Sequence, residues 1–211
     1  MIIMDSMRYD FFMQENIAEN MHLHLCQSLA PSTSEALPIL LTGKKQPRKK
    51  VVDKLNLSYG WMWLTKIVDK TLFDYFKAEG YNVHYINLNP DNENIQSSMM
   101  PSFFPSLPSG MCLKDFLACE KPYFLVLHDW TVHYPYGLNL TSREQLKAYH
   151  KHITLERAYR QAVKKFKTKI LPQILTTFKT ATLVLTADHG ENLGETIDNK
   201  TRFFHEPPMN K

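Results

Sequence analysis

Apolar and polar residues follow one another along this chain in blocks that predict strands and helices in alternation. Short apolar runs at 1–4, 121–130 and 182–187 are rich in aliphatic and aromatic residues, and residues 81–88 alternate between apolar and polar. Both patterns are typical of β-strands. The run at 182–187 is of the kind that is covered on both faces inside a parallel sheet. Four short, mostly buried strands are therefore expected.

Helical periodicity fills the intervals between these strands. A polar helical stretch continues to about residue 20, and Ser and Thr capping candidates precede the apolar run within 31–43, which predicts a helix start. Residues 70–80 have apolar side chains at helical spacing and end on a glycine suited to a helix C-terminus. One apolar stripe runs along a long helix over 142–178, which Pro172 is expected to kink or divide.

Strands that alternate with helices indicate the α/β class, with a mostly parallel sheet and helices on both of its faces. A chain of 211 residues fits one sizeable domain or most of a larger one. The sequence opens almost inside its first strand and stops in a loop. We therefore expect residues 1–211 to form a single domain that is truncated at its C-terminus.

Composition and charge narrow the class of protein only slightly. The chain is 44% hydrophobic and 22% charged, which is ordinary for a globular protein that fills a real core. Its net charge of +4 comes with basic runs at 44–50 and 164–169. Such runs favour a solvated face, and the alternative is attraction of an anionic substrate or a membrane surface. No nucleic-acid-binding motif is present, so no nucleic-acid partner is expected.

Cysteine content and hydropathy leave the compartment open. Cys26, Cys112 and Cys119 are too few and too irregularly spaced for a disulfide framework or a zinc knuckle, and we expect buried thiols. No apolar run is long enough to span a bilayer, and no signal peptide is visible. Transmembrane helices upstream in a full-length protein would favour a membrane-associated or extracytoplasmic location.

Polar residues follow several of the predicted strands at the point where each strand ends. Asp5 follows the first, Asp188 and His189 follow the last, and Thr33 lies at a predicted helix start. The Asp-His pair fits either a turn or a ligand site, and the carboxyl ends of parallel strands share one sheet edge. Carboxylate, imidazole and hydroxyl together suit a divalent cation of the zinc or manganese kind. A hydroxyl beside such an ion becomes a better nucleophile.

Five segments resemble, in order, the motifs of the sulfatase-like family of the alkaline phosphatase superfamily. They are the opening strand with its Asp, the nucleophile segment, a helix-Gly-Tyr-strand unit, the His-x-Pro-Tyr loop and the Asp-His-Gly-Glu motif. In this chain they read MIIMDSMRYDFF, APSTSEALPILLTGKKQP, TLFDYFKAEGYNVHYI, FLVLHDWTVHYPYG and TLVLTADHGENLGE. The resemblance covers nearly the whole chain and implies an alkaline-phosphatase-like fold.

The resemblance implies a metal site made of Asp5, Thr33, Asp188 and His189, with Thr33 also the nucleophile. Sulfatases carry at the position of Thr33 a cysteine within Cys-x-Pro-x-Arg that is converted to formylglycine. This chain has neither that cysteine nor the arginine, which puts sulfate-ester hydrolysis in doubt. A threonine nucleophile is what the phosphoethanolamine and phosphoglycerol transferases of the same superfamily use. The resemblance implies one divalent ion, with Zn, Mn and Ca as candidates and a second ion left open.

Two histidines match further positions of the family. His133 corresponds to the His-x-Pro-Tyr histidine and His205 to a histidine downstream of the Asp-His-Gly-Glu motif, so each is a candidate to protonate a leaving oxygen or bind a substrate phosphate. His128 and Asp129 are weaker candidates, and Arg8 is expected to form a structural salt bridge.

The leading interpretation is a metal-dependent hydrolase or transferase that acts on phosphate or sulfate esters. Its substrate would be anionic, with lipid-linked and glycan-linked esters both open. The alternative is a catalytically inactive sulfatase-like module with a binding or structural role, or an incomplete fragment. Metal content separates the first interpretation from an inactive module.

Overall fold

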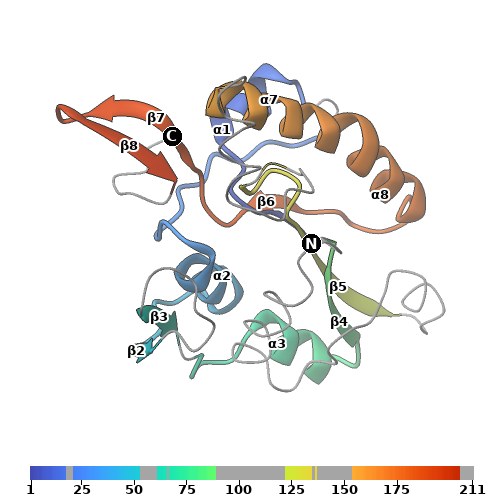
Figure 1. The fold of residues 1–211 in the computed structure, drawn as a ribbon. Helices are drawn as coiled ribbons and strands as arrows, with labels where there is room; N and C mark the ends of the chain where they lie inside the picture. The colour runs from blue at the N-terminus through green and yellow to red at the C-terminus, as the bar shows by residue number, and fades with distance from the viewer. Residues whose placement is uncertain are drawn as a thin grey trace. The chain divides into compact units, whose positions relative to one another are not determined.

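The computed structural model confirms an α/β fold with a mostly parallel central sheet (Figure 1). It describes residues 1–17, 21–52, 61–65, 67–88, 122–134, 136 and 154–204. The strands are β1 (Ile2–Met4), β2 (Arg48–Val52), β3 (Trp61–Thr65), β4 (Asn82–Asn87), β5 (Tyr123–Asp129), β6 (Leu185–Ala187), β7 (Asn192–Ile197) and β8 (Lys200–Phe204). The helices are α1 (Tyr9–Gln14), α2 (Thr33–Thr42), α3 (Leu72–Ala78), α7 (Leu155–Lys165) and α8 (Leu171–Thr177). None of the helices in these described ranges is long and apolar enough to cross a membrane.

The chain divides into two compact units. The first comprises residues 1–31 and 128–211, and the second comprises residues 32–127. The central sheet has the strand order β4-β5-β1-β6, and β5 continues from the second unit into the first. The expectation of a single domain stays a prediction.

The first unit is built around β1, whose side chains are all buried. β1 pairs in parallel with β6, so that Met4 lies opposite Ala187. The core is formed by apolar side chains of β1, α1 and the helical stretch 155–177. They include Ile2, Ile3, Phe11, Tyr159, Val163, Phe166 and Ile174. The four predicted strands are therefore present, and the first of them is as short and buried as its sequence indicates.

The prediction that residues 182–187 are covered on both faces is wrong. The strand that forms is the shorter β6, its residues are only half-buried, and Val184 just before it is 52% exposed. β6 is the last strand in the order of the described sheet and pairs with β1 on one side. An edge strand lacks a second neighbour, and an apolar sequence does not reveal its place in the order.

The long helix predicted over 142–178 is described from Thr154, whose side chain caps it by accepting a hydrogen bond from Arg157 N at 3.3 Å. Residues 142–153 lie outside the described residues. The helix is divided into α7 and α8 by a π-helical segment, Phe166–Ile170, directly before Pro172. Proline cannot donate the backbone hydrogen bond of a regular helix, which accounts for the division.

A hairpin of β7 and β8 follows the Asp-His-Gly-Glu segment and was not predicted (Figure 1). Its two-residue turn consists of Asp198 and Asn199, both with left-handed backbone, at φ 51° and 60°. Asp and Asn tolerate this conformation and favour tight hairpins, so the sequence did carry the signal. Cys26, expected to be buried, is exposed, and the other two cysteines lie outside the described residues.

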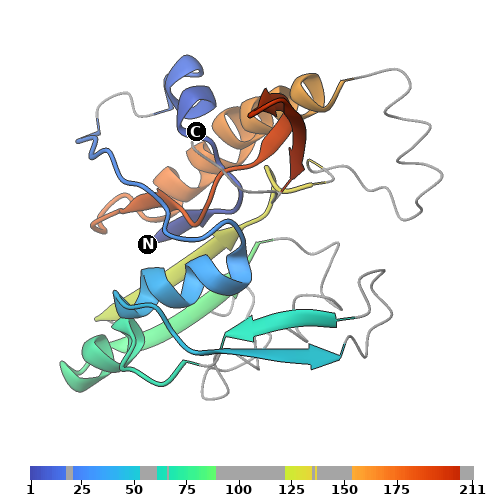
Figure 2. The ribbon, with the colours of Figure 1, turned by 90° about the vertical axis from the view of Figure 1, so that its left-hand side faces the viewer.

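The second unit carries α2, α3, β4 and an unpredicted antiparallel ribbon of β2 and β3 (Figure 2). Helix α2 begins at Thr33 and ends at Thr42, and it is capped by Gly43, whose φ of 71° is suited to glycine. Helix α3 begins with a capping box, in which the side chains of Thr71 and Asp74 each bond the other's backbone N–H. Both helices were predicted at these positions.

Candidate metal centre

Parallel pairing of β1 with β6 brings two carboxylates to the same end of the strands. Asp5 is the first residue after β1, and Asp188 is the first residue after β6. Because Met4 lies opposite Ala187, the next residues, Asp5 and Asp188, lie side by side at the carboxyl ends of the two strands. His189 follows at once, and all three residues are buried, with at most 3% of each exposed.

The ligand atoms of these three residues all lie within 4.8 Å of one another and could hold a metal ion. His189 Nε2 is 3.6 Å from Asp5 Oδ1 and 3.5 Å from Asp188 Oδ2. His189 Nδ1 donates to the Gly190 carbonyl at 2.7 Å, which fixes the ring and leaves Nε2 toward the carboxylates. Burial alone would lower the pKa of His189, but the negative charges of Asp188 and Asp5 outweigh it and raise that pKa.

Asp188 is oriented by backbone donors. Its Oδ1 accepts hydrogen bonds from Ser6 N at 3.2 Å and from His189 N at 2.9 Å. Its Oδ2 is buried and has no hydrogen-bond partner among the described residues. A buried carboxylate oxygen without a donor is costly, and a cation at this position would satisfy it.

Asp5 accepts a hydrogen bond on each oxygen. Ser6 Oγ donates to Oδ1 at 3.0 Å, and His128 Nε2 lies 3.0 Å from Oδ2. Burial alone would raise the pKa of Asp5, but three nearby imidazoles, led by that of His133, outweigh it and lower the pKa. Asp5 is therefore held as a carboxylate, the form that binds metal ions.

Ser6 and Tyr159 fix the short segment that carries Asp5. Ser6 has a left-handed backbone at φ 62°, a rare conformation for a residue other than glycine. The hydroxyl of fully buried Tyr159 donates to Ser6 O at 2.7 Å and accepts from Arg8 N at 2.7 Å. Burial raises the pKa of Tyr159 well above its usual value, so the hydroxyl keeps its proton.

Glu191, the glutamate of the Asp-His-Gly-Glu motif, is a further buried acid, to which the sequence assigned no role of its own. It is 3% exposed, and in the described part of the chain neither of its carboxylate oxygens meets the geometry of a hydrogen bond, although the buried Tyr136 hydroxyl lies close enough to offset part of the shift in its pKa. Burial, followed by the negative charge of Asp5, raises the pKa of Glu191 well above its usual value. Its place in the Asp-His-Gly-Glu motif was the signal that could have found it.

Asp129, a weaker candidate from the sequence, is buried at the end of β5, and its carbonyl accepts from Asp5 N at 2.9 Å. Burial raises the pKa of Asp129 to about 6, although Thr131 N and Oγ1 donate to its carboxylate at 3.0 and 3.1 Å. Asp129 therefore supports the backbone at the candidate metal centre.

Three candidate site residues from the sequence remain, and the structure describes two of them, His133 and Thr33. His133 lies close enough for its charge to act on Asp5, and its Nδ1 donates to Tyr134 O at 2.6 Å. Thr33 is the first residue of α2 in the second unit and is 8% exposed, and its predicted roles as ligand and nucleophile stay predictions. His205 lies outside the described residues.

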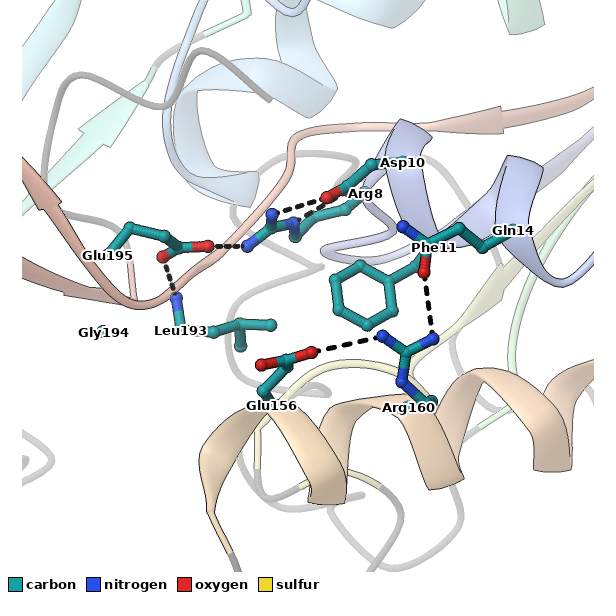
Figure 3. Close-up of a pocket in the computed structure, with 9 residues that line it drawn as sticks. All are labelled: Arg8, Asp10, Phe11, Gln14, Glu156, Arg160, Leu193, Gly194 and Glu195. Carbon is teal, nitrogen blue, oxygen red and sulfur yellow. Dashed lines mark hydrogen bonds and ion pairs between the residues drawn. The ribbon is translucent and has the colours of Figure 1, made fainter.

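Arg8 forms the structural salt bridges that the sequence suggested (Figure 3). Its guanidinium binds Asp10 at 2.7 Å, Glu195, and the carbonyl of Glu191 at 3.2 Å. The same group lines a cavity of about 290 Å³ between α1, α7 and β7. The charged groups there are paired with one another, and Arg160 stacks 4.7 Å from the centre of the Phe11 ring. This cavity is separate from the three ligand atoms and lies within a structural network.

No protein-family model, no curated protein and no solved structure matches this chain. The relationship to the sulfatase-like family therefore stays a prediction from the five motifs.

Proposed function

We propose that this protein is a metal-dependent hydrolase or transferase of phosphate esters, related to the sulfatase-like family. In this proposal Asp5, Asp188 and His189 hold one divalent ion. Thr33 is the nucleophile and a further ligand, and His133, with His205, binds or protonates the substrate. The substrate class is an anionic phosphate ester, because a threonine replaces the modified cysteine of sulfatases.

The observation that supports the proposal most directly is the closeness of three buried ligand atoms, one each from Asp5, Asp188 and His189, which lie within 4.8 Å of one another. If His189 Nε2 carried a proton and donated it to the carboxylates of Asp5 and Asp188, those hydrogen bonds would be about 2.7–2.9 Å long. The separations are 3.5 and 3.6 Å, too long for such bonds. Two ligands about 2.1 Å from one ion in tetrahedral arrangement are about 3.4 Å apart. The spacing thus favours an ion over a proton.

The donor set narrows the choice of ion. Two carboxylates and one imidazole suit Zn²⁺ or Mn²⁺, whereas Ca²⁺ prefers an all-oxygen shell. A bound divalent ion would supply positive charge that stabilises the negative charge on a phosphoryl group during transfer.

The chain's own residues would then perform a two-step transfer. Thr33 Oγ1 loses its proton to solvent and forms a bond to phosphorus as the bond to the leaving oxygen breaks. In this step His133 gives the leaving oxygen a proton from Nε2, while its Nδ1 donates to the Tyr134 carbonyl. Water or an alcohol then displaces Thr33 Oγ1 from phosphorus and releases the product.

The test compares ester turnover by the full chain and by Thr33→Ala. With Zn²⁺ or Mn²⁺ added, we expect bis(p-nitrophenyl) phosphate or p-nitrophenyl phosphate to be hydrolysed faster than p-nitrophenyl sulfate. Thr33→Ala should abolish turnover, and Ser34→Ala on the same helical turn is the control that should retain it. Mass spectrometry of the unmodified chain after incubation should show a phosphorylated Thr33.

Each outcome has a distinct meaning. Aryl-sulfate hydrolysis that survives Thr33→Ala would overturn both the nucleophile and the substrate class. A chain that binds metal but turns over none of these esters would instead support the inactive module or incomplete fragment.

A further inference from the structure

We propose that His128 is a positioning residue for the metal ligand Asp5. Its ring donates a hydrogen bond to one oxygen of the carboxylate, and this bond fixes the direction from which the other oxygen coordinates the ion. The inference rests on the proposed metal site and adds a residue to it that does not itself bind the ion.

The contact between the two side chains is short and entirely buried. His128 Nε2 lies 3.0 Å from Asp5 Oδ2, and both side chains have no exposed surface. His128 is the sixth residue of β5, and the backbone of Asp5 is bonded to the next residue of that strand, Asp129, at 2.9 Å. The backbone of β5 and the ring of His128 therefore hold the same residue from one side.

The proton in this contact belongs to His128. An ionised carboxylate only accepts hydrogen bonds, so a 3.0 Å contact with an imidazole nitrogen requires the proton on Nε2. A nitrogen that carries a proton has no lone pair for a metal ion. Among the described residues, the group of mutually close ligand atoms comprises Asp5, Asp188 and His189 and does not include His128.

The ring of His128 is itself held in place. Its centre lies 5.2 Å from that of the Trp130 ring, and Trp130 lies 4.7 Å from His133. Ser6 Oγ holds the other oxygen of Asp5 at 3.0 Å. With Ser6 on Oδ1 and His128 on Oδ2, rotation of the carboxylate would break two hydrogen bonds, so its orientation is set before any ion arrives.

The experiment compares two amides at position 128 in the full chain. The amide nitrogen of His128→Gln can reach the place of imidazole Nε2, whereas that of His128→Asn is about one bond shorter and cannot. The probe is Co²⁺, with its Kd and visible absorption spectrum as readouts. His84→Asn is the matched control, because His84 is also a buried histidine within a strand and belongs to the second unit.

We expect His128→Asn to weaken Co²⁺ binding by about 10–100-fold and to change the absorption spectrum, as loss of such outer partners does in other metal sites. His128→Gln should bind within about fivefold of the unmodified chain, with its spectrum, and His84→Asn should bind normally. If His128 only stabilised the fold, His128→Asn would lower the unfolding midpoint, and His128→Gln would not restore the Kd for Co²⁺ and the absorption spectrum.

The failures are distinguishable. If the unmodified chain binds no Co²⁺, Zn²⁺ or Mn²⁺, the proposed function is overturned along with the inference. If it binds and His128→Asn binds equally well, only the role of His128 is overturned. If His128→Asn does not fold, His128→Gln decides alone, and a Kd raised more than about fivefold overturns the inference.

Discussion

Removing the hydroxyl of Tyr159 should lower the free energy of unfolding by more than the loss of a single surface contact would. The Tyr159→Phe change keeps the ring and its edge-on packing against Phe11, at 4.9 Å between centres. It removes two hydrogen bonds of 2.7 Å, one donated to Ser6 O and one accepted from Arg8 N. Both partners belong to buried residues and would be left without their bond.

The expected loss follows from those two orphaned groups. A buried polar group that loses its partner costs about 1–3 kcal/mol, so two such groups cost about 2–4 kcal/mol once some local relaxation is allowed. The loss should appear as a lower urea midpoint with an unchanged slope, measured by circular dichroism in the presence of a chelator. The chelator keeps metal binding from adding to the stability.

The control is Tyr9→Phe, which removes a hydroxyl from a side chain that is 46% exposed in the same segment. We expect it to change the free energy of unfolding by less than about 0.5 kcal/mol. If Tyr159→Phe is as mild as the control, the two bonds do not fix the segment that carries Asp5, and our account of that segment is wrong.

Three further predictions concern the caps, the buried acid and the ion. Thr71→Ala should cost about 1 kcal/mol by breaking the capping box. The hydrogen bond from Thr71 N lowers the pKa of Asp74 below 3.8, so its stabilising effect is complete above that pH and is lost as the pH falls through the lowered pKa. The stability difference between the unmodified chain and Asp74→Asn should therefore shrink in acid, and a constant difference would contradict this. Glu191→Gln should stabilise the metal-free protein at neutral pH by about 1–3 kcal/mol, because a glutamate buried there either keeps its charge or takes up a proton on folding, and a glutamine does neither; a lower urea midpoint would refute it. Zn²⁺ at 100 times its Kd should add about 2.7 kcal/mol to the unmodified chain and much less to Asp188→Asn, measured by thermal unfolding. Equal gains in the two proteins would place the ion elsewhere.

The sequence was most informative about the ends of strands. Asp5 and Asp188 could be paired in advance because a strand end is a local feature, and parallel pairing brings such ends together. The hairpin turn at Asp198 and Asn199 was also visible locally and was overlooked. The start of α2 after Ser32 and its C-terminal cap at Gly43 belong to the same predictable class.

What the sequence could not reveal depends on neighbours that are distant along the chain. The exposure of β6 depends on its place in the strand order, which its apolar residues do not encode. The contact of His128 with Asp5 joins residues that are 123 positions apart. The burial of Glu191 likewise depends on what packs around it, because a glutamate after a glycine is ordinarily exposed.

The distribution of buried charge argues that the site and the stability of the fold are linked. Asp5, Asp188 and Glu191 are all buried near one end of β1 and β6, and the charge of Asp5 acts on Glu191. Arg8, whose charge acts on Glu191, is already paired with Asp10 and Glu195. Folding therefore brings acidic groups together at a cost, which the raised pKa of Glu191 records, and a cation that binds only the folded chain would reduce that cost. For such a site metal affinity is also folding free energy, so substitutions of the ligands should alter both together.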